Sequence, residues 1–239
     1  MTGVLIGVGV GPGDPEHLTL KALRALEGAD RVFVPDTDSG ETPGRAERLV
    51  APHVPAERIE RLTFAMRDDA ARAGNWDRAG AAIAAVVAAS GTAAFATIGD
   101  PNVYSTFTYV AQTVRELAPD VEVRTVPGIT AMQDLAARSG TVLAEGSERL
   151  ALVPYTAGHA RLREALGSFD TVVVYKGGRY LPRVLDAVRD AGRLENSVYG
   201  EQLGLEGEAV GAAAREGRAP YMSTVIVPAA RRGMRGERL

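Results

Sequence analysis

The stretch Gly7–Ala22, with the sequence GVGVGPGDPEHLTLKA, decides how the N-terminal part of the chain is read. Its glycine-rich part follows the apolar run Val4–Val8, which predicts a strand buried on both faces. Apolar residues then recur at helical spacing at Leu20, Leu23 and Leu26, with Thr19 as the expected N-cap and Gly28 as the expected stop. The glycine-rich segment is therefore a turn between a strand and a helix, where little side-chain bulk separates the backbone from a ligand.

This turn does not match the familiar phosphate-binding motifs. A dinucleotide fingerprint counted from Gly7 would place its third glycine at Pro12, and one counted from Gly9 would place it at Asp14. A P-loop needs Gly-Lys-Ser/Thr, which this stretch lacks. On its own, the segment is best explained as a structural turn.

Two further turns of the same kind change this interpretation. The segment Thr97–Ser105, TIGDPNVYS, follows an apolar run, and we expect Asp100 to cap the helix after it, with Pro101 in the first turn. The segment Val126–Ala131, VPGITA, places Thr130 near another helix start. Ligands of α/β folds bind at the carboxyl ends of parallel strands. Three such turns together favour a binding site.

The whole chain alternates between strand and helix patterns, which predicts an α/β fold with mostly parallel or mixed sheets. The turn at 118–120 is the expected boundary between an N-terminal α/β domain, 1–118, and a C-terminal α/β domain, 119–239, with a tail from about residue 230. Strands are predicted at 4–8, 31–35, 92–98, 121–126, 149–154, 170–176 and 223–228. Helices are predicted at 20–26, 79–89 and 181–191. A further helix ends at about residue 117, and another follows the turn at 126–131.

Composition excludes several functional classes. The 239 residues carry a net charge of −3 and no cysteine, which rules out disulfides, thiolate catalysis and cysteine-ligated zinc. His17, His53 and His159 lack metal-ligand spacing, so we expect no metal. The charge balance argues against nucleic acid and membrane partners, and no apolar run reaches the length of a membrane span. We expect a cytoplasmic protein.

The three turn sequences, in this order and spread over almost the whole chain, resemble the tetrapyrrole methylase family. The segments LTFAMRDD (62–69), YSTFTY (104–109), LAEGSERLALVP (143–154) and PYMSTVIVP (220–228) are similar to one branch, the precorrin-2 C20 methyltransferases of cobalamin synthesis, although Ala65 replaces a proline of that branch. The resemblance implies two α/β domains with S-adenosylmethionine in the cleft between them, a tetrapyrrole substrate, conversion of precorrin-2 to precorrin-3A, and a homodimer.

The resemblance also implies site residues. The cofactor would be bound by Pro12, Ile98, Gly99, Asp100, Val103, Thr130, Ala131, Lys176, Leu203 and Thr224. Asp100 and Tyr104 are the candidate catalytic residues for removing a proton after methyl transfer. Arg67 and Arg179 are the candidates for binding the carboxylates of the substrate, because arginine grips carboxylates with two hydrogen bonds.

Several alternatives remain open on the sequence. The acceptor of the methyl group could be the cobalt-loaded ring, or a different position of a tetrapyrrole. A non-catalytic module that binds the cofactor or the tetrapyrrole is a second class, against which the intact GPGD and GDP turns argue. An RNA methylase is a third, and the acidic balance of the chain speaks against it.

Overall fold

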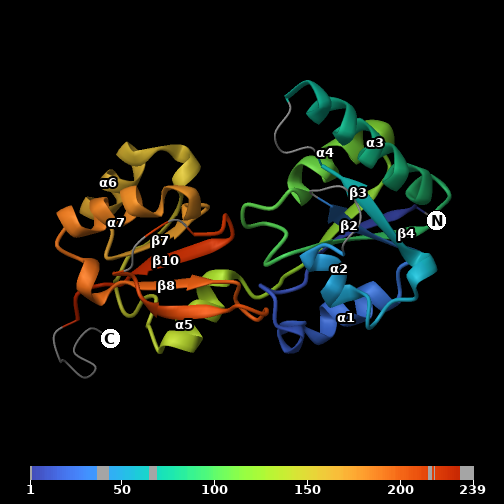
Figure 1. The fold of residues 1–239 in the computed structure, drawn as a ribbon. Coiled ribbons are helices and arrows are strands. Elements are labelled where there is room, and N and C mark those ends of the chain that lie inside the picture. Colours follow the sequence, from blue (N-terminus) through green and yellow to red (C-terminus); the bar gives the residue numbers. More distant parts are fainter. Residues whose placement is uncertain (1, 37–42, 65–68, 215–216, 218, 232–239) are drawn as a thin grey trace. The chain divides into compact units, whose positions relative to one another are not determined.

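The chain divides into two units, residues 1–130 and residues 131–239. The structure, a computed structural model, describes residues 2–36, 43–64, 69–214, 217 and 219–231, and it describes side chains of the helix that begins at Asp69 only from Gly74 onward. Each unit is an α/β layered structure built on its own five-stranded sheet (Figure 1). Within these residues, no helix is long and apolar enough to cross a membrane.

The first unit is built on a parallel sheet with strand order β3-β2-β4-β1-β5. Its strands are β1 (Val4–Gly9), β2 (Arg31–Asp36), β3 (Ile59–Thr63), β4 (Thr92–Thr97) and β5 (Glu122–Val126). Its helices are α1 (Leu20–Glu27), α2 (Arg45–Val50), α3 (Asp69–Ala88) and α4 (Phe107–Leu117), with short 3-10 helices at Pro15–His17 and Ala56–Arg58. The central strands β1 and β4 are almost wholly buried, as their continuous apolar sequences predict.

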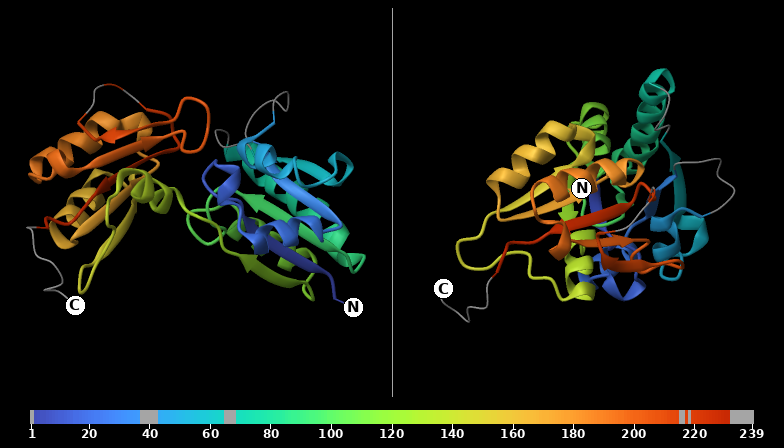
Figure 2. Two further views of the ribbon diagram at one scale, coloured as in Figure 1. Left: turned by 90° about the horizontal axis from the view of Figure 1, so that it is seen from below. Right: turned by 60° about the vertical axis from the view of Figure 1, so that its left-hand side comes forward.

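Each face of this sheet has its own hydrophobic core. Helices α1 and α2 cover one face, where Leu26 and Leu49 belong to one core cluster with Val8. Helices α3 and α4 cover the other face, where Ile83 and Val110 pack in one cluster with Leu5, Phe33 and Phe95. Figures 1 and 2 show the two pairs of helices on opposite sides of the strands. As predicted, α1 begins after Thr19, whose hydroxyl accepts from the Ala22 amide at 3.1 Å, and ends at Gly28.

The second unit contains a mixed sheet with strand order β6-β7-β10-β8-β9. Its strands are β6 (Leu150–Pro154), β7 (Thr171–Tyr175), β8 (Val198–Glu201), β9 (Ala209–Ala212) and β10 (Ser223–Val227). Its helices are α5 (Ala131–Ser139), α6 (His159–Ser168) and α7 (Leu181–Asp190), with 3-10 helices at Tyr155–Ala157, Gly178–Tyr180 and Leu194–Asn196. Strand β10 is antiparallel to β7 and β8, whereas β6 and β7 are parallel. Helices α6 and α7 pack on one face and α5 on the other (Figure 1).

The division between the units falls later than the predicted boundary at residue 118. The reason is strand β5, which pairs with β1 along the register Val4↔Glu122 to Val8↔Val126 and so completes the first sheet. The sequence pattern that indicates a new domain at residue 121 is therefore the fifth strand of the first unit. Helix α3 also begins ten residues before the predicted helix at 79–89, at Asp69.

Arg193 connects the segments of the second unit that lie where β7 begins and β10 ends. Its guanidinium donates to the carbonyl oxygens of Leu166 at 3.0 Å, Phe169 at 3.1 Å, Val227 at 3.2 Å and Pro228 at 3.1 Å, and also to that of Asp170. These carbonyls belong to the end of α6, the start of β7 and the end of β10. Burial lowers the pKa of Arg193, which is the expected effect of a low-dielectric environment on a cation.

Replacing Arg193 by methionine should lower the free energy of unfolding by about 3 kcal/mol, because several carbonyl groups lose their donor while the side-chain volume is largely kept. Urea denaturation followed by circular dichroism would measure the change. The control is Arg189→Met, whose exposed ion pair with Asp186 contributes at most about 0.5 kcal/mol. Equal stabilities of the two variants would contradict a structural role for Arg193.

Candidate functional site

Three turns meet at the carboxyl edge of the first sheet, where β1, β4 and β5 end side by side. The backbone joins the first two turns directly. The Gly99 amide donates to the Gly11 carbonyl at 2.8 Å, the same two residues form an antiparallel bridge, and the Val10 amide donates to the Thr97 carbonyl at 2.9 Å. The glycine-rich turn after β1 is thus held against the turn after β4.

Glycine is required where these turns touch. A Cβ on Gly9 would lie 2.5 Å from the Gly99 carbonyl oxygen, and one on Gly128 would lie 2.1 Å from the same atom. Gly99 itself has φ +71, and a Cβ placed on it would meet nothing within 4 Å. The turns are therefore packed backbone to backbone on one side of Gly99, whereas the space beside its Cα is open.

Asp100 joins the second turn to the third. Its Oδ1 accepts from the Asn102 amide at 2.8 Å, and its Oδ2 accepts from the Gly128 amide at 3.1 Å. The Asn102 side chain also donates to Thr125 Oγ1 at 3.3 Å. The expectation that Asp100 caps the following helix is wrong, because α4 begins only at Phe107, with Thr106 as its N-cap residue. The carboxylate instead connects two turns that are far apart in the sequence.

Tyr104 is held in an uncommon backbone conformation in the same turn. Its φ is +51, which costs an L-residue roughly 1–2 kcal/mol relative to ordinary conformations. The next residue, Ser105, fixes the turn, because its Oγ lies 2.9 Å from Thr97 Oγ1 and accepts from the Phe107 amide at 3.1 Å. The Tyr104 side chain is 42% exposed, and burial of the remainder raises the pKa of its hydroxyl. Near neutral pH the hydroxyl is thus a hydrogen-bond donor and not a phenolate base.

The remaining candidates of the first unit lie in these turns. Pro12 belongs to the turn after β1, Ile98 and Val103 to the turn after β4, and Thr130 to the end of the turn after β5. The three turns therefore bring together the candidates that the sequence places in separate segments. Arg67 lies outside the described residues.

In the second unit the candidates follow the ends of the strands. Lys176 comes directly after β7, Arg179 lies on the 3-10 helix Gly178–Tyr180, and Ala131 begins α5. Thr224 is the second residue of the central strand β10, 3% exposed, and pairs with Tyr175 on one side and Gly200 on the other. The start of α5 is tied to β7, because the Met132 amide donates to the Tyr175 hydroxyl at 3.1 Å.

Leu203 differs from the other candidates of this unit. Its side chain is 5% exposed and belongs to the core cluster of Leu135, Val173 and Ile226. The side chain therefore serves packing, which leaves only its backbone for a ligand.

Gln202, the residue before Leu203, is not among the sequence candidates although its backbone is unusual. Gln202 has φ +53 and Lys176 has φ +57, both in the left-handed region that side chains rarely adopt. The sequence carries no signal for this conformation at Gln202, because the residue type neither favours nor requires it.

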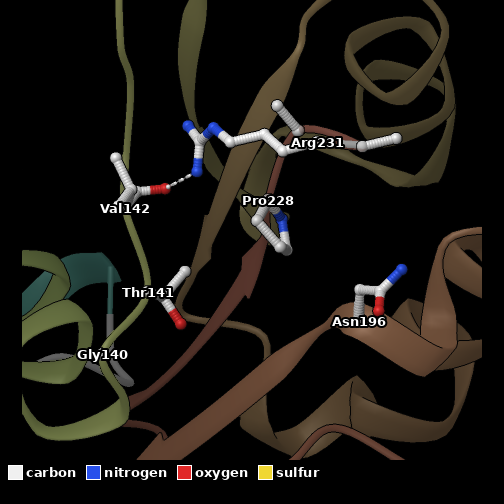
Figure 3. Close-up of a pocket in the computed structure, with 8 residues that line it drawn as sticks. Gly140, Thr141, Val142, Asn196, Pro228 and Arg231 are labelled. Carbon is white, nitrogen blue, oxygen red and sulfur yellow. Dashed lines mark hydrogen bonds between the residues drawn. The ribbon is translucent and has the colours of Figure 1, made fainter. Parts of the chain in front are cut away.

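A surface pocket of about 480 Å³ lies elsewhere in the second unit (Figure 3). It is lined by Gly140, Thr141, Val142, Asn196, Pro228, Ala229, Ala230 and Arg231. Arg231 donates to the Val142 carbonyl at 2.9 Å and forms ion pairs with Glu145 and Glu148. Its positive charge is therefore balanced by carboxylates of the protein. None of the sequence candidates lines this pocket. Among the described residues, no group of three or more acidic or histidine side chains is placed to hold a metal ion.

Comparisons with known proteins agree on one family. Residues 4–216 match the model of the tetrapyrrole (corrin/porphyrin) methylases. The chain is 36% identical over 236 residues to a precorrin-2 C(20)-methyltransferase of Sinorhizobium sp, covering 95% of each chain. It is 30% identical over 234 residues to a cobalt-precorrin-2 C(20)-methyltransferase of Salmonella typhimurium, covering 95% of this chain and 97% of the relative.

A solved structure shares the fold. The uroporphyrin-III C-methyltransferase of Thermus thermophilus, complexed with S-adenosylhomocysteine, matches with a TM-score of 0.66 at 23% identity, covering 94% of this chain and 97% of that one.

The Gly128→Ala variant tests the packing of the three turns. The added Cβ would collide with the Gly99 carbonyl, so we expect the free energy of unfolding to fall by about 3 kcal/mol in urea denaturation. Gly74→Ala in α3 is the matched control, since its Cβ would come no closer than 3.6 Å to another atom and alanine favours a helix. A Gly128→Ala protein as stable as the control would show that the turns are not closely packed.

Proposed function

This chain belongs to the tetrapyrrole (corrin/porphyrin) methylase family, and on that premise we propose that it transfers a methyl group from S-adenosylmethionine to C20 of precorrin-2 in cobalamin biosynthesis. The sequence supports the assignment over nearly its full length, because the precorrin-2 relative aligns with 95% of the chain. The product would be precorrin-3A.

The observation that carries the proposal is the junction of the three turns around Gly99. A methyl donor needs a site where backbone can lie against it without intervening side chains, and the open space beside the Gly99 Cα provides this. Ile98, Val103 and Pro12 supply apolar surface in the same turns. The residues of the first unit therefore fit S-adenosylmethionine. That a cleft between the two units holds this molecule stays a prediction.

The reaction makes limited chemical demands on the protein. When bound, the donor supplies an activated methyl group on a positively charged sulfur. The protein has to hold the acceptor carbon, the methyl group and the sulfur in line, and such orientation is worth about 7–11 kcal/mol of the barrier. Hydrogen-bonded turns are suited to this task, because they fix the backbone on which the donor lies. The expectation that no metal takes part stays a prediction.

We assign different roles to the two catalytic candidates. Both oxygens of Asp100 already accept backbone amides, so its carboxylate positions the turns. The Tyr104 hydroxyl, kept protonated by its raised pKa, would donate a hydrogen bond to the substrate. The substrate carries several carboxylates, for which the exposed Arg179 is a partner in the second unit.

One alternative has a specific observation in its favour. The Salmonella typhimurium relative is named for the cobalt-loaded substrate, and it aligns with the chain over the same span. The same site would then methylate cobalt-precorrin-2 at C20. A homodimer and a cytoplasmic location remain predictions from the family resemblance.

A single-turnover assay would decide between the two acceptors. The purified protein would receive S-adenosylmethionine with precorrin-2, or with the cobalt-loaded ring, under anaerobic conditions, and mass spectrometry would follow the product. We expect one added methyl group on precorrin-2. Methylation only of the cobalt-loaded ring would support the alternative, and methylation of neither acceptor would overturn the C20 assignment.

Asp100→Asn separates positioning from proton transfer. The amide keeps one acceptor but turns a donor toward a backbone N–H, so we expect about 10-fold weaker binding of S-adenosylhomocysteine, equivalent to about 1.4 kcal/mol. The turnover rate should fall without a change in the shape of its pH profile. Asp120→Asn, at an exposed turn before β5, is the control. Unchanged affinity combined with loss of the acidic limb of the profile would instead identify Asp100 as the base.

A further inference from the structure

The backbone of Tyr104 adopts a conformation that a tyrosine does not favour by itself. Its φ is +51, in the left-handed region where a bulky side chain is an outlier. Ser90, with φ +61, has an ordinary explanation, because it lies in the turn after α3, where a left-handed residue commonly ends a helix. Tyr104 instead lies in the connection from β4 to α4. Its neighbours must therefore hold it in this conformation.

A pair of hydroxyl groups holds the residue that follows Tyr104. Ser105 Oγ lies 2.9 Å from Thr97 Oγ1 and accepts from the Phe107 amide at 3.1 Å. Thr97 is itself fixed, because it ends β4, is 5% exposed, and accepts from the Val10 amide at its carbonyl. The Ser105 hydroxyl thus connects the end of a buried strand to the first residue of α4.

Packing fixes the start of α4 on the sheet. Phe107, the first residue of this helix, is 3% exposed. A Cβ on Gly7 of β1 would lie 2.5 Å from its ring, so the glycine leaves the space that the ring fills. The ring also lies 6.1 Å from that of Phe95 in β4, measured between centroids. The start of α4 therefore rests on both β1 and β4.

Contacts on both sides of Tyr104 explain why its backbone conformation persists. On the N-terminal side, the Val103 amide donates to the Asp100 carbonyl at 3.3 Å. On the C-terminal side, Ser105 is held through its hydroxyl. Residues that their surroundings hold in such conformations cluster at functional sites. The partly exposed side chain of Tyr104 thus extends from a backbone that is fixed at both ends.

We propose that Ser105 is a positioning residue for methyl transfer, which acts through Tyr104 and has Thr97 as its anchor. This inference rests on the proposed function, in which the Tyr104 hydroxyl donates a hydrogen bond to the tetrapyrrole. Without the Ser105 hydroxyl, the turn is free to relax to an ordinary conformation, and the tyrosine hydroxyl then leaves the position that the substrate needs. The turn between β4 and α4 thereby orients a donor before the substrate binds.

Variants of the two hydroxyl residues test this role in the single-turnover assay, with the acceptor that the wild-type protein methylates. Ser105→Ala and Thr97→Val should each lower the rate of methyl transfer about 10-fold, because the donor is misplaced. Thr97→Ser keeps the hydroxyl and should restore most of the rate. The matched control is Thr113→Val further along α4, where the lost hydroxyl donates to the Tyr109 carbonyl at 3.2 Å, and its rate should not change.

Binding of S-adenosylhomocysteine separates this effect from a loss of folding. All of these variants should bind it within about twofold of the wild-type protein, since the turn of Gly99 stays intact. Thr97→Val repeats the test if Ser105→Ala does not fold, because valine keeps the shape of the threonine side chain.

Combination with Tyr104→Phe shows whether Ser105 acts through the tyrosine hydroxyl. If it does, adding Ser105→Ala to Tyr104→Phe should change the rate by less than about twofold, because the group that it positions is already gone. A purely structural role would lower the rate of the Tyr104→Phe protein by the same factor of about 10. That result would overturn the proposal, as would a Ser105→Ala protein with the wild-type rate.

A binding measurement repeats the comparison without turnover. Sirohydrochlorin is an air-stable tetrapyrrole with acetate and propionate side chains, and calorimetric titration would follow its binding. Ser105→Ala and Tyr104→Phe should each weaken it about fivefold, the effect of one lost hydrogen bond, and the double variant should bind it no more weakly than either. Multiplied losses in the double variant would contradict an action through Tyr104.

Failure of the proposed function has a different signature. In that case the wild-type protein itself would neither bind S-adenosylhomocysteine nor methylate a tetrapyrrole, and the role of Ser105 would be overturned with it. Failure of the inference alone leaves an active wild-type protein whose rate does not depend on the hydroxyl pair.

Discussion

The close approach of three backbone turns to the carbonyl group of Gly99 is the constraint on which the first unit depends. Gly9 and Gly128 leave no room for a Cβ on that side, and the Asp100 carboxylate holds the third turn in place. These contacts exist only because β1, β4 and β5 are adjacent and parallel, so that their carboxyl ends coincide. The strand order and the glycines of the turns are thus both needed for the three backbone turns to approach one another closely.

Backbone geometry and not reactive side chains dominates the candidate site. In the first unit the candidate residues lie on hydrogen-bonded turns with an open face beside Gly99, and in the second unit they lie near strand ends with left-handed residues. This agrees with methyl transfer, in which the donor brings its own leaving group and orientation contributes much of the rate. Asp100 is an example, since both oxygens of its carboxylate accept hydrogen bonds from backbone amides of the protein.

Much of the fold could be predicted from the sequence, because the buried strands are continuous apolar runs and glycine marks their ends. The three turns of the site were predicted for the same reason. The short strands β3, β8 and β9 are not predicted, since four or five residues with partly exposed positions leave no clear pattern. The role of β5 in the first sheet depends on its pairing with β1, a long-range contact that local sequence does not encode.

Side-chain roles were less predictable than the turns that carry them. The cap role expected of Asp100 follows from a local rule, whereas its partner Gly128 is 28 residues away. Leu203 is a candidate only through the family resemblance, whereas its side chain is buried in the same core cluster as Leu135. The left-handed backbone of Gln202 could not be identified at all, because a backbone dihedral angle is a property of the folded chain.

The order of the strands also affects synthesis of the chain. The first sheet is complete once β5 has emerged, at residue 126, so the first unit has all its strands while much of the chain is still being translated. The second sheet differs, because its central strand β10, at 223–227, is the last to be made. Until then β7 and β8 lack the strand that joins them, and each leaves an edge unpaired. A nascent chain that stops shortly before residue 223 therefore carries a finished first half and a second half with two exposed strand edges, a substrate for chaperones and proteases.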